Sequence, residues 1–439
     1  MICPFHAELH SKRRTALLDA MAAKGPDAVA IFPSAPVYTR NNDVDHDYRQ
    51  DSDLFYLTGF DEPNSVLVLS GRDRKATLFV RPRDPEREVW DGPRAGVDGA
   101  KARFGADDAF VITELTNELP RLLQNQRRLF YRLGRDRTFD DKILEAIDRT
   151  RSRARMGVTW PTEILDPAQI VHEMRIYKVE QDLDAMRTAA KITHEAHLRA
   201  MGATKPGMHE FEVEAMLLET FRRNGSERAA YGSIVGSGAN ATVLHYRQNN
   251  KKMESGELLL IDAGCEYGYY AADVTRTFPV NGTFSREQQA IYELVLEAQE
   301  AGVEMTRKGS TLEGIHKKCV EVITAGLVRL GLLHGDVEKL IDTDAYKPFF
   351  MHRTSHWLGM DVHDVGAYWV DGNARPLDAG MVITVEPGIY IAKDYEKVPP
   401  QWRGIGVRIE DDILVTEGAP DNLTASIPKT VADVVRACA

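Results

Sequence analysis

Cysteine is scarce in this sequence of 439 residues, which contains four, at positions 3, 265, 319 and 438. Their spacing fits no zinc-binding motif, and so few cysteines in so long a chain argue against a disulfide framework and favour reduced thiols in a cytoplasm. Cys265 lies close in sequence to Asp262. Free cysteines are usually buried neutral thiols, so we expect Cys265 to be a core residue and not a metal ligand.

Long apolar runs and an excess of positive charge are also missing. No uninterrupted apolar segment approaches the length needed to cross a bilayer, and residues 1–24 carry early charges where a secretory signal would have an apolar core. The formal net charge of -11 argues against general nucleic-acid binding, which needs a concentrated basic surface. We therefore expect a cytoplasmic protein that binds neither membranes nor nucleic acids.

The length and the apolar fraction of 43% are those of a globular protein with two domains. Four apolar runs predict strands, at 27–34, 65–70, 76–80 and 129–133. Two helix-like segments, at 114–123 and 142–149, alternate with them, which indicates a mixed sheet with helices on its faces. The pattern changes near 172–178, so we expect an α/β (α+β) chain with a smaller mixed-sheet α/β domain at 1–175 and a second domain at 176–439.

The second domain has four segments with apolar residues at helical spacing. They are 183–200, a segment that follows Pro206-Gly207 and stops at Asn224-Gly225, one that starts at Ser285, and 311–330. Ser285 with Gln288 three residues later is a capping-box pattern. Four further runs predict strands, at 258–262, 272–278, 381–390 and 407–415. A hairpin centred between Tyr267 and Gly268 would place Asp262 opposite Asp273.

Carboxylates in apolar surroundings are the most informative feature of these strands. Asp262, Asp273, Glu386 and Glu410 each interrupt an apolar run, where an unpaired charge is costly. Two like charges about 4 Å apart repel by roughly 4 kcal/mol at an effective dielectric of 20, so four together need divalent cations. Taken singly, each carboxylate is better explained by a salt bridge or a turn, but the joint pattern favours metal binding.

Histidines are concentrated at 352–364, where His352, His356 and His363 occur among apolar residues and a glycine. For a single histidine, a hydrogen bond in the core is the better explanation, but one imidazole added to four carboxylates suits two divalent ions, with Mn²⁺ as first choice and Co²⁺, Zn²⁺ or Mg²⁺ as alternatives. Two such ions lower the pKa of a shared water and polarise a carbonyl, which indicates hydrolysis. We expect His245, His352 and His363 to contact the substrate or to transfer the leaving group's proton.

Three charged residues near Glu410 are harder to interpret. Arg408 shares a strand face with Glu410, and it either neutralises that carboxylate or contacts the substrate. Asp411 and Asp412 follow directly, and we expect them to be solvent-exposed turn residues rather than ligands.

At these residues the sequence resembles the metallopeptidase family with the pita-bread fold, which includes methionine aminopeptidase, prolidase, aminopeptidase P and creatinase. The family's ligand order of Asp, Asp, His, Glu, Glu is matched by Asp262, Asp273, His356, Glu386 and Glu410, and residues 355–359 match its Ser-His-Xaa-Leu-Gly signature. The resemblance implies that Asp273 and Glu410 bridge two metals, that Asp262 completes one metal site, and that His356 with Glu386 completes the other. It also implies that Glu386 assists the attack on the substrate.

Within this family the sequence is most similar to the aminopeptidase P group, at residues 48–60 in the first domain and 171–175 at the junction. The resemblance implies substrate contacts from His245, His352, His363 and Arg408, a hydrogen bond from Tyr390, and a position near the cleft for Asp43. Arg353-Thr354 departs from the Gly-Leu expected in the family motif. A long cation there either alters the cleft wall or pairs with a neighbouring subunit.

The resemblance implies a dinuclear-metal hydrolase that removes the amino-terminal residue from peptides with proline at the second position. One alternative is a prolidase that cleaves Xaa-Pro dipeptides, and another, of a different class, is a catalytically inactive pita-bread binding module. An inactive module should have lost ligands, and all five are present. We expect peptides as partners and a homo-oligomer, either a dimer or a tetramer.

Overall fold

The structure is a computed structural model that describes residues 6–439, so Cys3 lies outside the described residues. The chain divides into two compact units, one ending at Met174 and one running from Arg175 to Ala439. We call them the amino-terminal unit and the carboxy-terminal unit. No helix among residues 6–439 is both long enough and apolar enough to cross a membrane. Cys265, Cys319 and Cys438 are buried and form no disulfide.

The amino-terminal unit is built on one mixed sheet with the strand order β6-β5-β4-β1-β7-β8. Its strands are β1 (Ala28–Pro33), β4 (Val66–Ser70), β5 (Lys75–Val80), β6 (Asp108–Val111), β7 (Arg128–Phe130) and β8 (Glu163–Leu165). Antiparallel pairing joins β1 to β4 and β4 to β5, and the remaining pairs are parallel. The predicted mixed sheet is confirmed. A separate small hairpin consists of β2 (Thr39–Asn41) and β3 (Val44–Asp45).

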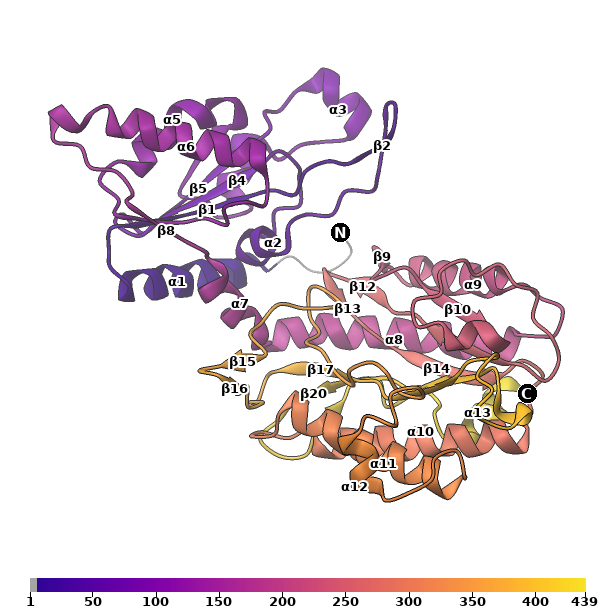
Figure 1. Ribbon diagram of the computed structural model, residues 1–439. Helices are drawn as coiled ribbons and strands as arrows, with labels where there is room; N and C mark the ends of the chain where they lie inside the picture. Colours follow the sequence, from indigo (N-terminus) through magenta and orange to yellow (C-terminus); the bar gives the residue numbers. More distant parts are fainter. Residues whose placement is uncertain (1–5) are drawn as a thin grey trace. The chain divides into compact units, whose positions relative to one another are not determined.

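Helices cover both faces of this sheet (Figure 1). The helices of this unit are α1 (Ala7–Ala23), α2 (Ser52–Thr58), α3 (Pro85–Asp91), α4 (Gly96–Ala102), α5 (Leu115–Leu123) and α6 (Arg137–Arg151), of which α3 has no buried residues, and α7 (Ala168–Ile176) contains the boundary between the units. Apolar side chains of α5 and α6 pack with those of β1, β4 and β5 into one core. Helix α1 lies on the opposite face and was not anticipated from the sequence.

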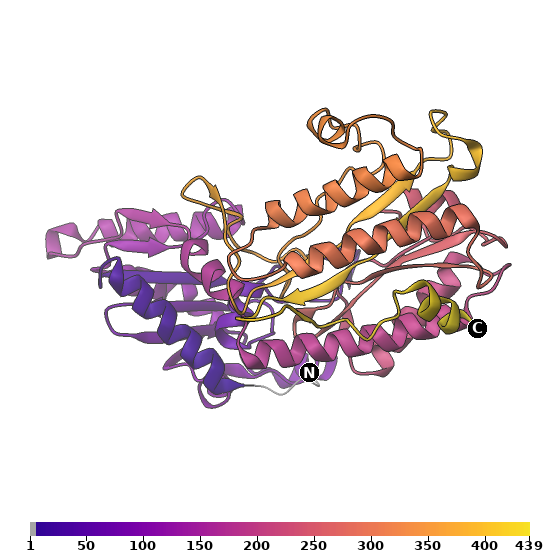
Figure 2. The ribbon, with the colours of Figure 1, turned by 90° about the horizontal axis from the view of Figure 1, so that it is seen from below.

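The carboxy-terminal unit places curved antiparallel strands between helices (Figure 1). Its helices are α8 (Glu180–Ala203), α9 (Glu210–Arg223), α10 (Arg286–Met305), α11 (Leu312–Arg329), α12 (Val337–Asp342) and α13 (Val431–Cys438). The four long helices fall where the apolar spacing predicts them. The Ser285–Gln288 capping box is confirmed. The backbone N–H of Ser285 donates to Gln288 Oε1 (2.9 Å), and the backbone N–H of Gln288 donates to Ser285 Oγ (3.2 Å). Helices α10 and α11 lie side by side (Figure 2).

Small sheets of two or three short strands form the sheet layer of this unit. The strands are β9 (Arg228–Ala229), β10 (Ile234–Ser237), β11 (Leu258–Asp262), β12 (Cys265–Tyr267), β13 (Tyr270–Ala271), β14 (Thr275–Pro279), β15 (Trp369–Val370), β16 (Asn373–Ala374), β17 (Val382–Val385), β18 (Gly388–Ile391), β19 (Ile405–Arg408), β20 (Asp411–Leu414) and β21 (Asp421–Asn422). Their apolar side chains pack with those of the helices in two main core clusters.

The hairpin formed by β11 to β14 differs from its prediction by one residue. Its two turn residues, Gly268 and Tyr269, have positive φ values of 59° and 70°, as a type I′ turn requires. The turn therefore begins one residue later than expected. Asp262 pairs with Thr275, so the predicted placement of Asp262 opposite Asp273 is wrong.

The two strands predicted at 381–390 and 407–415 are each broken in the middle. β17 pairs with β20, and β18 pairs with β19, in the same antiparallel register. The shared register places Glu386 and Glu410 opposite each other at the break. There the backbone N–H of Glu410 donates to the carbonyl of Thr275 (3.1 Å), and that of Glu386 donates to the carbonyl of Thr354 (2.8 Å). The break thus turns both carboxylates toward neighbouring segments.

Gly264 provides a test of the hairpin. A Cβ atom at this position would lie 1.8 Å from the carbonyl oxygen of Ala272, which is a backbone atom that cannot rotate away. Since overpacking a tight site costs about 1–3 kcal/mol or more, we expect Gly264→Ala to lower the thermal unfolding midpoint and the amount of bound divalent metal. Gly418→Ala is the control, because its nearest neighbour lies at 3.9 Å. Equal midpoints for the two variants would contradict this account of the hairpin.

Candidate metal centre and substrate pocket

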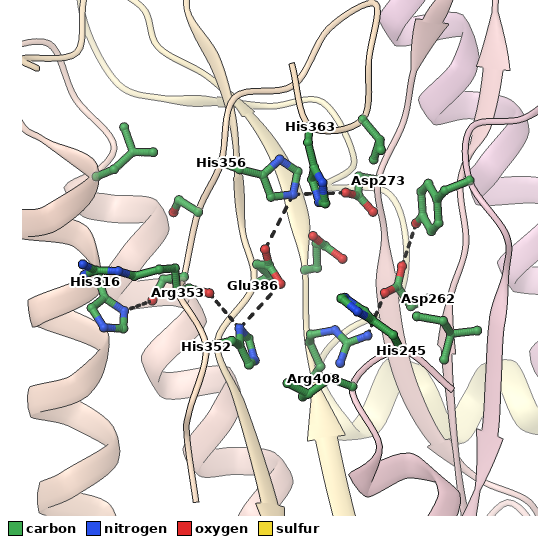
Figure 3. Close-up of a pocket in the computed structure, with 18 of the residues that line it drawn as sticks. His245, Asp262, Asp273, His316, His352, Arg353, His356, His363, Glu386 and Arg408 are labelled. Atoms are coloured by element: carbon green, nitrogen blue, oxygen red, sulfur yellow. Dashed lines mark hydrogen bonds and ion pairs between the residues drawn. The ribbon is translucent and has the colours of Figure 1, made fainter. Parts of the chain in front are cut away.

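A pocket of about 780 Å³ in the carboxy-terminal unit collects residues that are far apart in the sequence (Figure 3). Nine of the residues singled out from the sequence line it: His245, Asp262, Asp273, His352, His356, His363, Glu386, Arg408 and Glu410. Tyr390 is buried and contacts the pocket residues His352 and Arg408. Convergence of these segments is the arrangement that a shared site requires.

The candidate metal ligands lie at the ends and breaks of strands. Asp262 is the last residue of β11, and Asp273 precedes β14 by two residues. Glu386 and Glu410 occupy the facing strand breaks. His356 lies on a loop that runs beside β17, where its backbone N–H donates to Thr384 Oγ1 (3.2 Å). Asp262 keeps the ladder partners Ile234 and Thr275, whereas Asp273, Glu386 and Glu410 lie outside the strands, and all four residues line one pocket.

Three of these residues come close enough to share one cation. Asp273, His356 and Glu410 have ligand atoms within 4.8 Å of one another. His356 Nε2 lies 3.4 Å from Asp273 Oδ2 and 3.6 Å from Glu386 Oε1. His356 Nδ1 donates to the carbonyl of Trp357 (3.0 Å), which directs Nε2 toward the carboxylates. The donor set of carboxylate oxygens and one imidazole fits a hard or borderline divalent cation.

The electrostatics of the cluster also indicate a missing positive charge. Burial, followed by repulsion from Asp273 and Glu386, raises the pKa of Glu410 well above its ordinary value. Burial raises the pKa of Glu386 to about 7 despite the nearby His356. Burial alone would lower the pKa of His356, but the hydrogen bond to Asp273 and the charge of Glu386 raise it to about 9. Without a cation the cluster retains protons, and divalent ions would allow it to ionise fully.

Asp262 is held by two polar neighbours. Tyr231 donates its hydroxyl to Asp262 Oδ1 (2.7 Å), and Arg408 Nη2 donates to Asp262 Oδ2 (2.7 Å). Burial raises the pKa of Asp262, and the charge of Arg408 opposes that effect. Tyr231 was missed in the sequence, where no pattern distinguishes it from other tyrosines. Arg408 pairs with Asp262, whereas Glu410 accepts a hydrogen bond from Thr275 Oγ1 (2.7 Å).

A directed hydrogen-bond chain runs from Arg408 to His352. Arg408 Nη1 lies 2.9 Å from Tyr390 Oη, which lies 2.8 Å from His352 Nε2, and His352 Nδ1 lies 2.7 Å from the carbonyl of Arg353. Burial and the charge of Arg408 lower the pKa of His352 to about 3, so the ring is neutral. Because a carbonyl can only accept, Nδ1 carries the proton and Tyr390 donates to Nε2. The chain fixes the tautomer of His352.

Asp411 and Asp412 are buried, which corrects their predicted exposure. Burial would raise the pKa of Asp411, but Arg276 and Lys429 hold it well below its ordinary value. Arg276 Nη2 donates to Asp411 Oδ1 (2.6 Å) and Lys429 Nζ to Asp411 Oδ2 (2.7 Å). The backbone N–H of Asp273 donates to Asp412 Oδ2 (3.1 Å). Asp411 and Asp412 thus stabilise the segments that carry the candidate metal ligands, from the side away from the pocket.

Two other predicted residues lie away from this cluster. Cys265 is a buried core residue, and burial raises the pKa of its thiol to about 12, so the expected neutral thiol is confirmed. Asp43 belongs to the amino-terminal unit, where it is exposed between β2 and β3. Its expected position near the cleft stays a prediction.

Comparison with known families covers both units. The model described as metallopeptidase family M24 matches residues 184–417, and the model described as aminopeptidase P, N-terminal domain, matches residues 10–131. The chain belongs to metallopeptidase family M24. The predicted fold, a smaller mixed-sheet α/β domain followed by a pita-bread domain, is confirmed.

Individual relatives match along nearly the whole chain. The Xaa-Pro aminopeptidase of Escherichia coli is 45% identical over 421 residues, which are 95% of this chain and 94% of that protein. Xaa-Pro aminopeptidase 3 of Homo sapiens is 35% identical over 435 residues, 96% of this chain and 82% of that protein. The structure of the Pseudomonas aeruginosa aminopeptidase PepP has a TM-score of 0.97 at 50% identity and covers 100% of this chain and 99% of its own. Zinc-substituted E. coli aminopeptidase P in complex with product has a TM-score of 0.95 at 43% identity, over 99% and 98%.

The raised pKa values predict how pH affects the metal-free protein. The pKa of Glu386 rises from 4.5 to about 7 and that of His356 from 6.5 to about 9. Both groups hold protons more tightly in the folded state, so their contribution to stability is lost as pH rises from about 5 to 9. We expect the melting midpoint of metal-free protein to fall over this range and saturating Mn²⁺ to remove much of the fall. Parallel pH profiles with and without metal would contradict the expectation.

Proposed function

We propose that this protein is a Xaa-Pro aminopeptidase, a metallo-aminopeptidase that removes the first residue from peptides with proline in second position. The observation that carries the proposal is the convergence of all five candidate ligands with His245, His352, His363 and Arg408 in one pocket. Relatives named Xaa-Pro aminopeptidase that match over more than nine-tenths of both chains support it. The complete ligand set leaves no support for an inactive binding module.

The metal centre is assigned to five residues. Asp273 and Glu410 would be shared between two divalent ions, Asp262 would complete one site, and His356 with Glu386 would complete the other. When bound, the two ions lower the pKa of a water molecule and polarise the scissile carbonyl. We propose Mn²⁺ as the native ion, with Co²⁺ and Zn²⁺ as substitutes, because carboxylate-rich sites favour hard or borderline cations.

The side chains around the metal centre supply proton transfer, hydrogen bonds to the substrate and the shape of the pocket. Glu386, a carboxylate that lines the pocket, would accept a proton from the attacking water and return it toward the prolyl nitrogen. His245, His363 and Arg408 line the pocket and donate hydrogen bonds to the peptide carbonyls. The prolyl nitrogen belongs to a tertiary amide with no N–H, so its departure needs this proton. Neutral His352, oriented by Tyr390, forms a wall of the pocket beside Glu386.

Further aspects of the proposal concern the whole protein. Residues 1–175 are proposed as an amino-terminal domain and residues 176–439 as the catalytic domain. We also propose a cytoplasmic homo-oligomer, dimeric or tetrameric, in which Asp43 lies near the cleft. Analytical ultracentrifugation of the purified protein tests the oligomeric state.

Substrate length tests the proposed activity directly. With Mn²⁺ present, we expect release of alanine from Ala-Pro-Ala and little hydrolysis of Ala-Ala-Ala, measured by chromatography of the products. Removal of metal with a chelator should abolish turnover, and added Mn²⁺ should restore it. Preference for the dipeptide Ala-Pro over Ala-Pro-Ala would instead identify a prolidase. Failure to cleave any Xaa-Pro peptide at any metal loading would overturn the assignment.

Tyr390→Phe tests the hydrogen-bond chain. The variant removes the hydroxyl that accepts from Arg408 and donates to His352, so Arg408 and the His352 ring lose their fixed orientation. Loss of an orienting partner around a metal site typically costs about 10–100-fold, and we expect kcat/KM for Ala-Pro-Ala to fall by about tenfold with metal content unchanged. Tyr395→Phe, at a tyrosine outside the pocket lining, is the control. Equal kinetics for both variants would remove Tyr390 from the site.

A further inference from the structure

Arg353 combines a fixed backbone with an extended side chain at one end of the pocket. Its carbonyl accepts the hydrogen bond from His352 Nδ1 (2.7 Å), and the carbonyl of the next residue, Thr354, accepts from the backbone N–H of Glu386 (2.8 Å). Thr354, next to Arg353, is thus bonded to the backbone of the candidate ligand Glu386, and His352 Nδ1 lies 3.8 Å from Glu386 Oε2. The Arg353 side chain itself lines the pocket and remains 65% exposed.

The pocket has two ends of opposite character. Asp262 and His245 lie on one side of Glu386, and Arg353 and His316 lie on the other (Figure 3). His316 accepts or donates one hydrogen bond with Thr354 Oγ1 (2.8 Å), and burial together with the charge of Arg353 lowers its pKa to about 4, so its ring is neutral. Arg353 thus carries the positive charge at this end, opposite the acidic cluster.

The present partner of Arg353 is easily exchanged. Arg353 Nη1 donates to Glu313 Oε2 (2.9 Å), but the two side chains are 65% and 51% exposed. Ion pairs with that exposure contribute little to stability because water screens them. A second carboxylate can replace Glu313 at small cost, and a guanidinium binds carboxylates through two parallel hydrogen bonds.

We propose that Arg353 forms a subsite for the free α-carboxylate of short peptide substrates, with Glu313 as the counter-ion that the substrate carboxylate displaces. The inference rests on the proposed function, in which the substrate is a short peptide with a free amine at one terminus and a free carboxylate at the other. Its scissile bond lies at the end that holds the candidate metal ligands, and its free carboxylate is attracted to Arg353 at the other end. The consequence is a preference for tripeptides with a free carboxyl terminus over amidated or longer peptides.

The dimensions agree with a tripeptide. Two residues beyond the scissile bond span at most about 7 Å of extended chain. Arg353 directly follows His352, whose Nδ1 lies 3.8 Å from Glu386 Oε2, and the Arg353 side chain lines the same pocket. The carboxylate of a pentapeptide would pass beyond it.

The ratio of kcat/KM for Ala-Pro-Ala to that for its amide, Ala-Pro-Ala-NH2, measures the subsite and cancels differences in folding or metal loading between variants. For a partly exposed charge-assisted contact, we expect a ratio of about five to ten in the unmodified enzyme. The two peptides should differ in KM and have similar kcat. Arg353→Gln should bring the ratio close to one. Glu313→Gln should raise it, since Arg353 loses its competing partner. At 0.5 M NaCl the preference of the unmodified enzyme should shrink.

Lys347→Gln is the matched control, because it removes an exposed positive charge near His316 from a residue that does not line the pocket, and it should leave the ratio unchanged. A ratio near one in the unmodified enzyme, or the same ratio in Arg353→Gln, overturns the inference. In both cases the two peptides are still cleaved, so the proposed function stands. If neither peptide is cleaved, the proposed function itself has failed.

Discussion

Repulsion among buried carboxylates is the constraint on which the rest of the carboxy-terminal unit depends. Glu386 and Glu410 face each other across a break in two paired strands, and Asp262 and Asp273 approach from a neighbouring hairpin. A fold driven only by apolar burial would not gather these charges. Divalent cations bound among these candidate ligands would offset the repulsion.

The polar groups behind the cluster are arranged to support this site. Arg276 is fully buried and binds Asp411 together with the carbonyl of Glu410. Asp412 receives the backbone N–H of Asp273. Each contact holds the main chain at a candidate ligand and does not involve the carboxylate oxygens of that ligand. Charges outside the pocket therefore position the backbone, while Tyr231, Arg408 and Thr275 contact the carboxylates of Asp262 and Glu410 directly.

Periodicity and local motifs in the sequence were sufficient to predict the mixed sheet, the four long helices and most of the residues singled out in the pocket. Features that depend on tertiary geometry were missed. The hairpin turn lies one residue later than predicted, at Gly268 and Tyr269, which moves the partner of Asp262 by two residues, because local sequence does not decide between adjacent turn positions. Asp411 was taken as exposed because its partners, Arg276 and Lys429, lie at distant positions in the chain. Tyr231 likewise gains its role only through contact with Asp262.

The loop from His352 to His356 has a consequence for how substrate range can diverge in this family. Its main chain is fastened to β17 and to the residue after it, through Thr384 and Glu386, so the position of the imidazole ligand does not depend on the side chain at 353. The Arg353 side chain takes no part in these backbone contacts. Substitution there can retune recognition of the far end of a peptide while the chemistry at the scissile bond stays constant, which separates the evolution of selectivity from that of turnover.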